Sequence, residues 1–180
     1  IGITDHGFAH LAFGLKRKAV PSLISECRAA SRELGIDVLV GMEANILGED
    51  GSTDMKESDY ENFDLFVCGK HVLVAYASAR DWWHYFGGNF TADKFRRKPP
   101  RALVERNTRA YIAMIRNNPV DILSHLGYLC PADAAEVAKC AADYGTYIEL
   151  NSKKTHLSDE ELYAVGRSGA RFVVDSDAHS

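Results

Sequence analysis

The sequence lacks the features that mark membrane proteins and extracellular disulfide-rich domains. No apolar run among its 180 residues is long enough to span a bilayer. The four cysteines, at positions 27, 68, 130 and 140, show neither CxxC pairing nor the spacing of a disulfide framework. Such usage is typical of reduced, buried thiols. We therefore expect a cytoplasmic protein that does not bind membranes.

The chain also has no excess of basic residues. Its 21 Lys and Arg and 25 Asp and Glu give a formal net charge of −4, which argues against a dedicated nucleic-acid binder. The sequence has no initiator methionine and no signal pattern, and it opens on what reads as the end of a strand. Because 180 residues are enough for one substantial core, we expect a single domain over residues 1–180 that is a fragment of a longer chain.

Short apolar runs alternate with helical patterns along the chain. Pro21 near the start of one helical pattern and Gly35 just after it are typical helix boundaries. This alternation predicts an α/β fold built on a parallel sheet or barrel. Strands are expected at the N-terminus and at 36–40, 64–68, 120–124, 146–150 and 171–175, and helices at 21–34, 132–144 and 158–168. A further helix-like segment starts in the basic residues at 94–101 and runs to 117.

The segment from Tyr76 to Lys98 has no clear period. It combines several aromatic residues, Trp82 and Trp83 among them, with Gly87-Gly88, and is predicted to be a long active-site loop or lid. A cluster of basic residues begins inside this segment. If the cluster folds over the site, its positive charge would attract a phosphate; alternatively, it is a basic face exposed to solvent. The cluster consists of Lys94, Arg96, Arg97, Lys98 and Arg101.

Four of the seven histidines, with one glutamate and one aspartate, stand where strand-like runs end. Side chains at the carboxyl ends of parallel strands share a crevice, and imidazole and carboxylate suit divalent transition metals. One such histidine alone is more often part of a hydrogen-bonded core, but the joint placement favours a multinuclear metallohydrolase. His10, His84 and His156 lack this context and are expected at the surface or in loops. The predicted metal ligands are His6, Glu43, His71, His125, Asp177 and His179.

At these residues the sequence resembles the polymerase and histidinol phosphatase (PHP) family. The resemblance implies a distorted (β/α)7 TIM-like barrel that is incomplete here, because the first strand with its His-x-His pair and the C-terminal part are missing. The motifs follow the family order over nearly the whole chain. They are Ile3-Thr4-Asp5-His6-Gly7, Gly41-Met42-Glu43-Ala44-Asn45, Cys68-Gly69-Lys70-His71, Ser124-His125-Leu126-Gly127 and Asp175-Ser176-Asp177-Ala178-His179.

The resemblance also implies roles for the ligands, with up to three divalent ions (Zn, Mn or Fe) in the complete domain. Glu43 would bridge two ions, and His71 and His125 would serve one of them. Asp177 would serve the other, alongside the missing pair, and His6 and His179 a third. Since only the site of His71 and His125 keeps all its expected ligands, we expect one ion to bind firmly and the others weakly.

The expected reaction is hydrolysis of a small phosphomonoester by a metal-activated water. Glu43, Asp5 and His179 are the catalytic candidates, with Asp5 orienting a ligand or the water, and the general acid stays open. Two alternatives remain: an amidohydrolase-like enzyme acting on C–N bonds, and a non-catalytic PHP-like module. The candidates for substrate binding are Arg96, Arg97, Lys70 and Asn151, with Lys153, Lys154 and His156 as further contacts.

Overall fold

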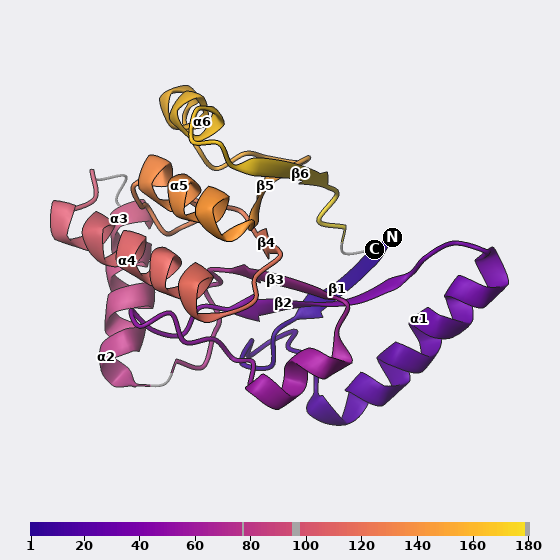
Figure 1. Cartoon of the computed structure of the whole chain (residues 1–180). Helices are drawn as coiled ribbons and strands as arrows, with labels where there is room; N and C mark the ends of the chain where they lie inside the picture. The colour runs from indigo at the N-terminus through magenta and orange to yellow at the C-terminus, as the bar shows by residue number, and fades with distance from the viewer. Residues whose placement is uncertain (77, 95–97, 179–180) are drawn as a thin grey trace.

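The computed structural model describes residues 1–76, 78–94 and 98–178. Within these residues, six strands form one parallel sheet whose spatial order follows the sequence. The sheet curves into a half-barrel (Figure 1), so the α/β prediction is confirmed, while the seven-stranded barrel stays a prediction. The strands are β1 (Gly2–His6), β2 (Leu39–Asn45), β3 (Leu65–Gly69), β4 (Ile122–Leu123), β5 (Tyr147–Asn151) and β6 (Arg171–Asp175).

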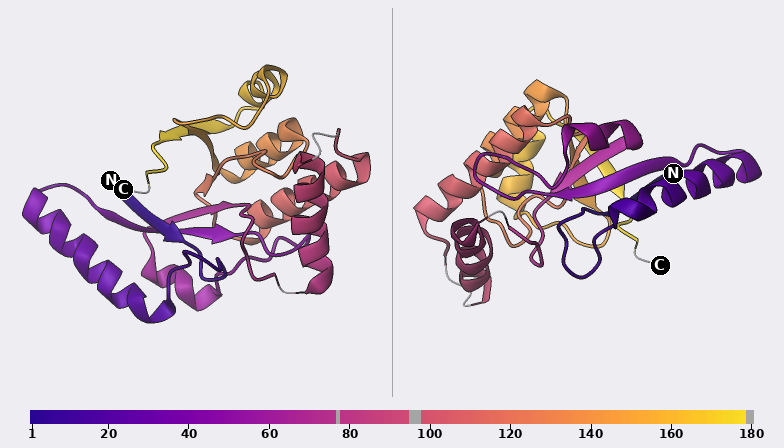
Figure 2. Two further views of the ribbon diagram at one scale, coloured as in Figure 1. Left: turned by 180° about the vertical axis from the view of Figure 1, so that it is seen from behind. Right: turned by 90° about the horizontal axis from the view of Figure 1, so that it is seen from below.

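Helices cover the outer face of this sheet. Local capping explains several of their boundaries: Gly35 ends α1 with φ of 66°, and Asp133 accepts a hydrogen bond from the backbone N–H of Glu136 at the start of α5. The helices α4, α5 and α6 pack one beside the next (Figures 1 and 2). The four long helices are α1 (Val20–Leu34), α4 (Arg101–Asn117), α5 (Ala134–Tyr144) and α6 (Asp159–Gly166).

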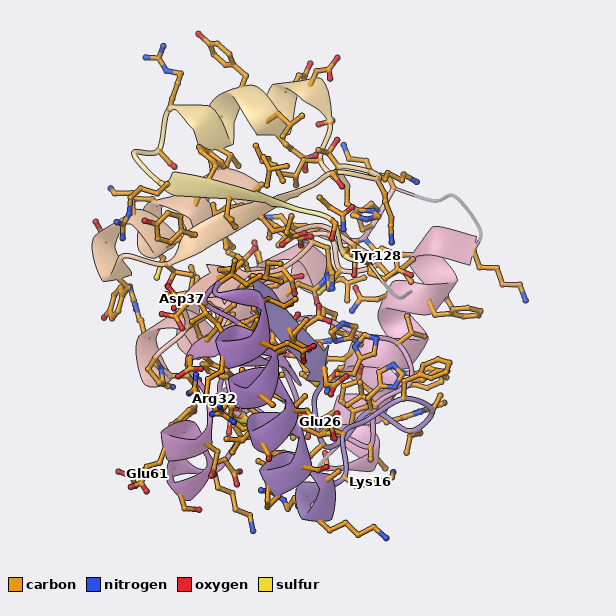
Figure 3. The ribbon with its side chains drawn as sticks, turned by 90° about the vertical axis from the view of Figure 1, so that its right-hand side faces the viewer. Lys16, Glu26, Arg32, Asp37, Glu61 and Tyr128 are labelled. Carbon is orange, nitrogen blue, oxygen red and sulfur yellow. The ribbon has the colours of Figure 1, made fainter. Side chains whose placement is uncertain are left out.

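The core lies between the sheet and α4 and α5. Met42, Leu123 and Ile148 from the strands are fully buried against Tyr111 and Val137 from these helices. The outer side of α1 is polar, and its Glu26 and Arg32 face solvent (Figure 3). All four cysteines are buried and free, as expected. No helix in the described part of the chain is long and apolar enough to cross a membrane.

Strand β2 lies further along the chain than expected. It was predicted at 36–40 but runs from Leu39 to Asn45, which places Glu43 inside the strand. The reason is tertiary: β1 and β3 pair with β2 on both sides, in a register that sets His6 opposite Glu43 and Glu43 opposite Val67. The pairing continues the strand through residues that local propensity alone would assign to a turn.

The loop predicted at 76–98 is wrong for residues 79–94, and a lid function for this segment stays a prediction. These residues form helices α2 (Ala79–Asp81), η3 (Trp82–Gly88) and α3 (Asn89–Lys94), which stand beside α4 (Figure 2). The physical reason is burial: Tyr85 is 1% exposed, and Asn89 and Asn107 of α4 exchange side-chain hydrogen bonds of 2.8 and 3.3 Å. Arg96 and Arg97 lie outside the described residues.

Candidate metal centre

Three histidines surround the carboxylate of Glu43. Its Oε1 lies 3.2 Å from His71 Nε2 and 3.1 Å from His125 Nε2. Its Oε2 lies 3.2 Å from His6 Nδ1. The four side chains come from the first four strands or the turns just after them, and they meet because the parallel register aligns these strand ends. The structure thus brings together four of the six predicted ligands.

Close packing at Gly69 is needed for this convergence. This residue ends β3, beside the turn that carries His125. A Cβ atom on Gly69 would lie 2.8 Å from His125 Cε1 and 2.1 Å from Ser124 Oγ, closer than atoms pack. The missing Cβ at Gly69 therefore leaves room for the Ser124 hydroxyl and for the His125 ring that reaches Glu43.

The arrangement fits a divalent metal ion. The Nε2 atoms of His71 and His125 lie only 3.3 Å apart while both face Glu43 Oε1. Ligand atoms from His6, Glu43 and His71 also lie within 4.8 Å of one another. Imidazole nitrogens and a carboxylate oxygen converging on one point are the donor set that zinc, manganese and iron accept. Glu43, His6 and His71 could therefore hold an ion, and His125 Nε2 faces the same carboxylate.

Charge at the centre is carried by Glu43. Burial alone would raise the pKa of this carboxyl, but hydrogen bonds with His125, His6 and His71 outweigh burial and hold its pKa far below the usual range. The hydrogen bond with Glu43 raises the pKa of His6, whereas burial lowers that of His71. The carboxylate is thus ionised at any physiological pH, as a metal ligand must be.

Glu149, which sequence reasoning did not identify, supports His125 from behind. Its buried carboxylate accepts a hydrogen bond from the backbone N–H of His125. Burial raises the pKa of Glu149 to about 7, and the neighbouring Asp175 adds to the shift. A glutamate at the centre of the apolar run Tyr147-Ile148-Glu149-Leu150 was the available signal, because an acid buried in a strand needs a partner.

His10 lies in the loop after β1, one of the two places expected for it, but it is not at the surface. It is 8% exposed, and its ring stacks on His6 with centroids 4.6 Å apart. Its Nδ1 accepts a hydrogen bond from the backbone N–H of Phe13 at 3.1 Å. Its position four residues after the Asp-His motif carries no signal by itself; only the loop's fold brings it back onto His6.

A cleft of about 450 Å³ opens above the centre. Three of the candidates for substrate contacts, Lys153, Lys154 and Asn151, line it, and Asn151 donates to Asp177 Oδ2 at 3.1 Å. Asp177 itself adopts a left-handed backbone with φ of 42°. The remaining lining residues are His6, His10, Phe13, Glu43, His71, Val72, Leu73, His125, Tyr128 and His156.

Two other predicted site residues, Lys70 and Asp5, do not line the cleft. Lys70 is 3% exposed, and its ammonium donates to the backbone oxygen of His71 and to Tyr76 Oη, away from the opening. Burial lowers the pKa of Lys70 to about 8. Asp5 is exposed and precedes His6 in β1, so it faces the opposite side of the strand. His179 lies outside the described residues.

Comparison with known proteins gives relatives but no family model that matches the chain. The sequence is 30% identical over 193 residues to a protein of Caldanaerobacter subterraneus named "probable phosphatase". It is 28% identical over 193 residues to one of the same name from Thermoanaerobacter sp.. Each alignment covers 99% of this chain but 63% and 66% of these relatives, so the chain spans just under two thirds of their length.

Solved structures show where the fold recurs. A Listeria monocytogenes protein assigned as a histidinol phosphatase matches with a TM-score of 0.62 and 13% identity, over 99% of this chain and 83% of its own. Histidinol phosphate phosphatase from Lactococcus lactis, complexed with zinc, L-histidinol and phosphate, matches with a TM-score of 0.57 and 14% identity, over 99% and 73%. At these identities the likeness establishes a shared fold.

Proposed function

We propose that this chain carries the metal centre of a metal-dependent phosphatase that hydrolyses a small phosphomonoester. The observation that carries the proposal is the convergence of His71 and His125 on Glu43 at the floor of a cleft with lysines among its lining residues. The relatives named "probable phosphatase" and the resemblance to the PHP family support the same reading.

The ligand set is proposed as follows. His71, His125 and Glu43 would hold one divalent ion, and Glu43 would also serve a second. When bound, such ions lower the pKa of water towards about 7 and provide hydroxide at neutral pH. The assignments of Asp177 to a second ion and of His179 to a third stay predictions, as do the number and identity of the ions.

The chain's own residues bind and orient the ester. Lys153 and Lys154 add positive charge to a rim that receives a phosphate dianion. Lys153 Nζ also donates to the backbone oxygen of Asp177, and Asn151 donates to the Asp177 carboxylate, so the two residues hold that carboxylate in place. Glu43, ionised and enclosed by three histidines, balances the charge at the floor of the cleft.

Two other functions stay open and make different predictions. An amidohydrolase-like enzyme would prefer cyclic amides to phosphate esters in a substrate panel. A non-catalytic module would turn over neither, even when the chain is extended by its natural upstream sequence. The cleft favours the phosphatase, since Lys153 and Lys154 suit an anionic substrate better than a neutral amide.

The test combines metal content with turnover. We would measure bound metal by plasma mass spectrometry, and hydrolysis of phosphomonoesters and cyclic amides, for the parent and for Glu43→Gln. Glu26→Gln, an exposed change on α1, is the matched control. We expect Glu43→Gln to lose metal and at least about 100-fold in kcat/KM, and the control to lose neither. A metal-free parent, or a preference for amides, would contradict the proposal.

A further inference from the structure

One wall of the cleft is apolar and strongly exposed. Phe13 is 73% exposed and Leu73 is 50% exposed, yet both line the same cavity as Glu43 and the metal-binding histidines. Val72, between His71 and Leu73, extends this wall. Together Phe13, Val72 and Leu73 form what we call the apolar wall. Its side chains offer no hydrogen-bonding group, so it gives a ligand apolar contact only.

The apolar wall is held in a defined position. The backbone N–H of Leu11 donates to the backbone carbonyl of Leu73 at 2.8 Å. The backbone N–H of Leu15 donates to the backbone carbonyl of His6 at 2.9 Å. The Asp54 carboxylate accepts hydrogen bonds from the backbone N–H of Ala9 at 2.7 Å and from that of Asn45 in β2 at 2.8 Å. These bonds attach the loop after β1, which carries Phe13, to the sheet. These contacts fix the loop at both ends and across its middle, so the exposed ring of Phe13 stands on a well-supported backbone.

A series of rings leads from the metal centre to this wall. His6 stacks on His10, and the Phe13 ring lies 5.7 Å from that of His10 at an angle of 31°. Phe13 also lies 6.4 Å from the ring of His6, which contacts Glu43. A group attached to a phosphate at the metal centre could therefore reach the Phe13 ring. Rings at such spacings and offsets interact favourably with a further planar ring.

The lysines and carboxylates of the cleft are not part of the apolar wall. Lys153 and Lys154 belong to the segment after β5, and the two carboxylates among the described lining residues are Glu43 and Asp177. Glu43 is surrounded by histidines and Asp177 accepts from Asn151. The apolar wall itself contains no charge to pair with an ionic leaving group.

From this division we infer that the cleft accepts phosphate monoesters of an uncharged aromatic alcohol, with the ring against Phe13 and Leu73 and the phosphate towards Lys153 and Lys154. This inference rests on the proposed phosphatase function, because it concerns the same cleft. It names the substrate class: aryl or arylalkyl phosphates are preferred to phosphates of polyols, whose hydroxyl groups would lose hydrogen bonds to water against the apolar wall.

The inference is tested by measuring ligand binding to the cleft separately from ester hydrolysis. Phenylphosphonate and methylphosphonate are stable against phosphatase action, and only the first carries a ring. Calorimetric titration of the metal-loaded protein with each gives a ratio of affinities, and the change of this ratio between variants reports on the apolar wall. We expect phenylphosphonate to bind about three- to tenfold more tightly, the effect of one favourable ring contact. Phe13→Ala should abolish this preference and Phe13→Tyr should keep it.

Leu11→Ala provides the matched control. Leu11 lies in the same loop and is 66% exposed, but it is not among the residues that line the cleft. It should leave the ratio of the two affinities unchanged. Equal binding of both phosphonates, absence of binding, or loss of the preference in Leu11→Ala as well would overturn the inference.

Turnover then separates the two proposals. Hydrolysis of phenyl phosphate and glycerol 2-phosphate at equal rates would keep the phosphatase and reject the aromatic preference. A preserved preference for phenylphosphonate, with no ester or amide turned over, would keep the apolar wall as a ring-binding site and reject the phosphatase.

Discussion

The carboxylate of Glu149 accepts a hydrogen bond from the backbone N–H of His125, on the side of the strand end away from Glu43. His125 is held with φ of 31°, a left-handed conformation that costs a residue other than glycine about 1–3 kcal/mol. The hydrogen bond stabilises this conformation, and the conformation directs His125 Nε2 towards Glu43. Glu149 is thus a positioning residue for a candidate metal ligand.

This relationship predicts different effects for two substitutions at Glu149. Glu149→Gln keeps an oxygen that can accept the His125 N–H, whereas Glu149→Leu leaves a buried donor unpaired. We expect Leu to weaken metal affinity about 10- to 100-fold, the usual effect of losing a partner behind a ligand, and Gln to weaken it far less. Competition with a fluorescent chelator measures both. Equal losses in the two variants would mean that the charge of Glu149 matters rather than its acceptor.

Gly69→Ala should disrupt the centre through contact alone. The added methyl group would collide with the Ser124 hydroxyl and the His125 ring, so the His125 side chain must shift from its place beside Glu43. We expect a loss of about 1–3 kcal/mol in the free energy of unfolding together with weaker metal binding. Gly166→Ala is the control, because a Cβ there meets no atom within 4 Å. Urea unfolding and metal titration of both variants would test the prediction, and unaltered metal binding in Gly69→Ala would contradict it.

Acid stability should depend on Asp59. Burial by itself would raise the pKa of Asp59, but hydrogen bonds from Arg17 and from the backbone N–H of Lys56 outweigh burial and lower it. A folded-state pKa below the unfolded value stabilises the fold above the unfolded pKa, and this contribution is lost as the pH falls through the folded pKa. Its size is about 1 kcal/mol, since the Arg17 side chain is 45% exposed.

The check is urea unfolding between about pH 5 and 3, the range around and below the unfolded pKa of an aspartate. The free energy of unfolding should fall less steeply with acidification in Asp59→Asn than in the parent. Asp37→Asn replaces another aspartate, an exposed one, and should follow the parent. Parallel profiles for Asp59→Asn and the parent would remove Asp59 as a source of acid sensitivity.

The helical segment from Ala79 to Lys94 should affect stability rather than catalysis. Asn107→Ala removes its hydrogen bonds with Asn89 and with the carbonyl of Pro131, and should cost about 1–3 kcal/mol in the free energy of unfolding. Trp83→Ala changes an exposed side chain in a different cavity and should leave KM for a phosphomonoester within about twofold. A large rise in KM for Trp83→Ala would support the lid hypothesis.

The sequence alone determined the α/β class and identified Glu43 with three histidines that the structure places around it, because both depend on local pattern. Apolar runs alternate with helical periods, and metal-binding residue types recur where those runs end. The Ile3 to Gly7 and Ser124 to Gly127 motifs carry this information within a few residues, and so needed no knowledge of distant contacts.

Tertiary structure decided the rest. The register between β1 and β2 extended β2 past Glu43, and packing against α4 folded residues 79–94 into helices despite their weak period. His10 and Glu149 enter the centre only because a loop turns back onto His6 and because β5 lies beside β4. Such contacts join residues far apart in the chain, so their energies have no counterpart in local sequence pattern.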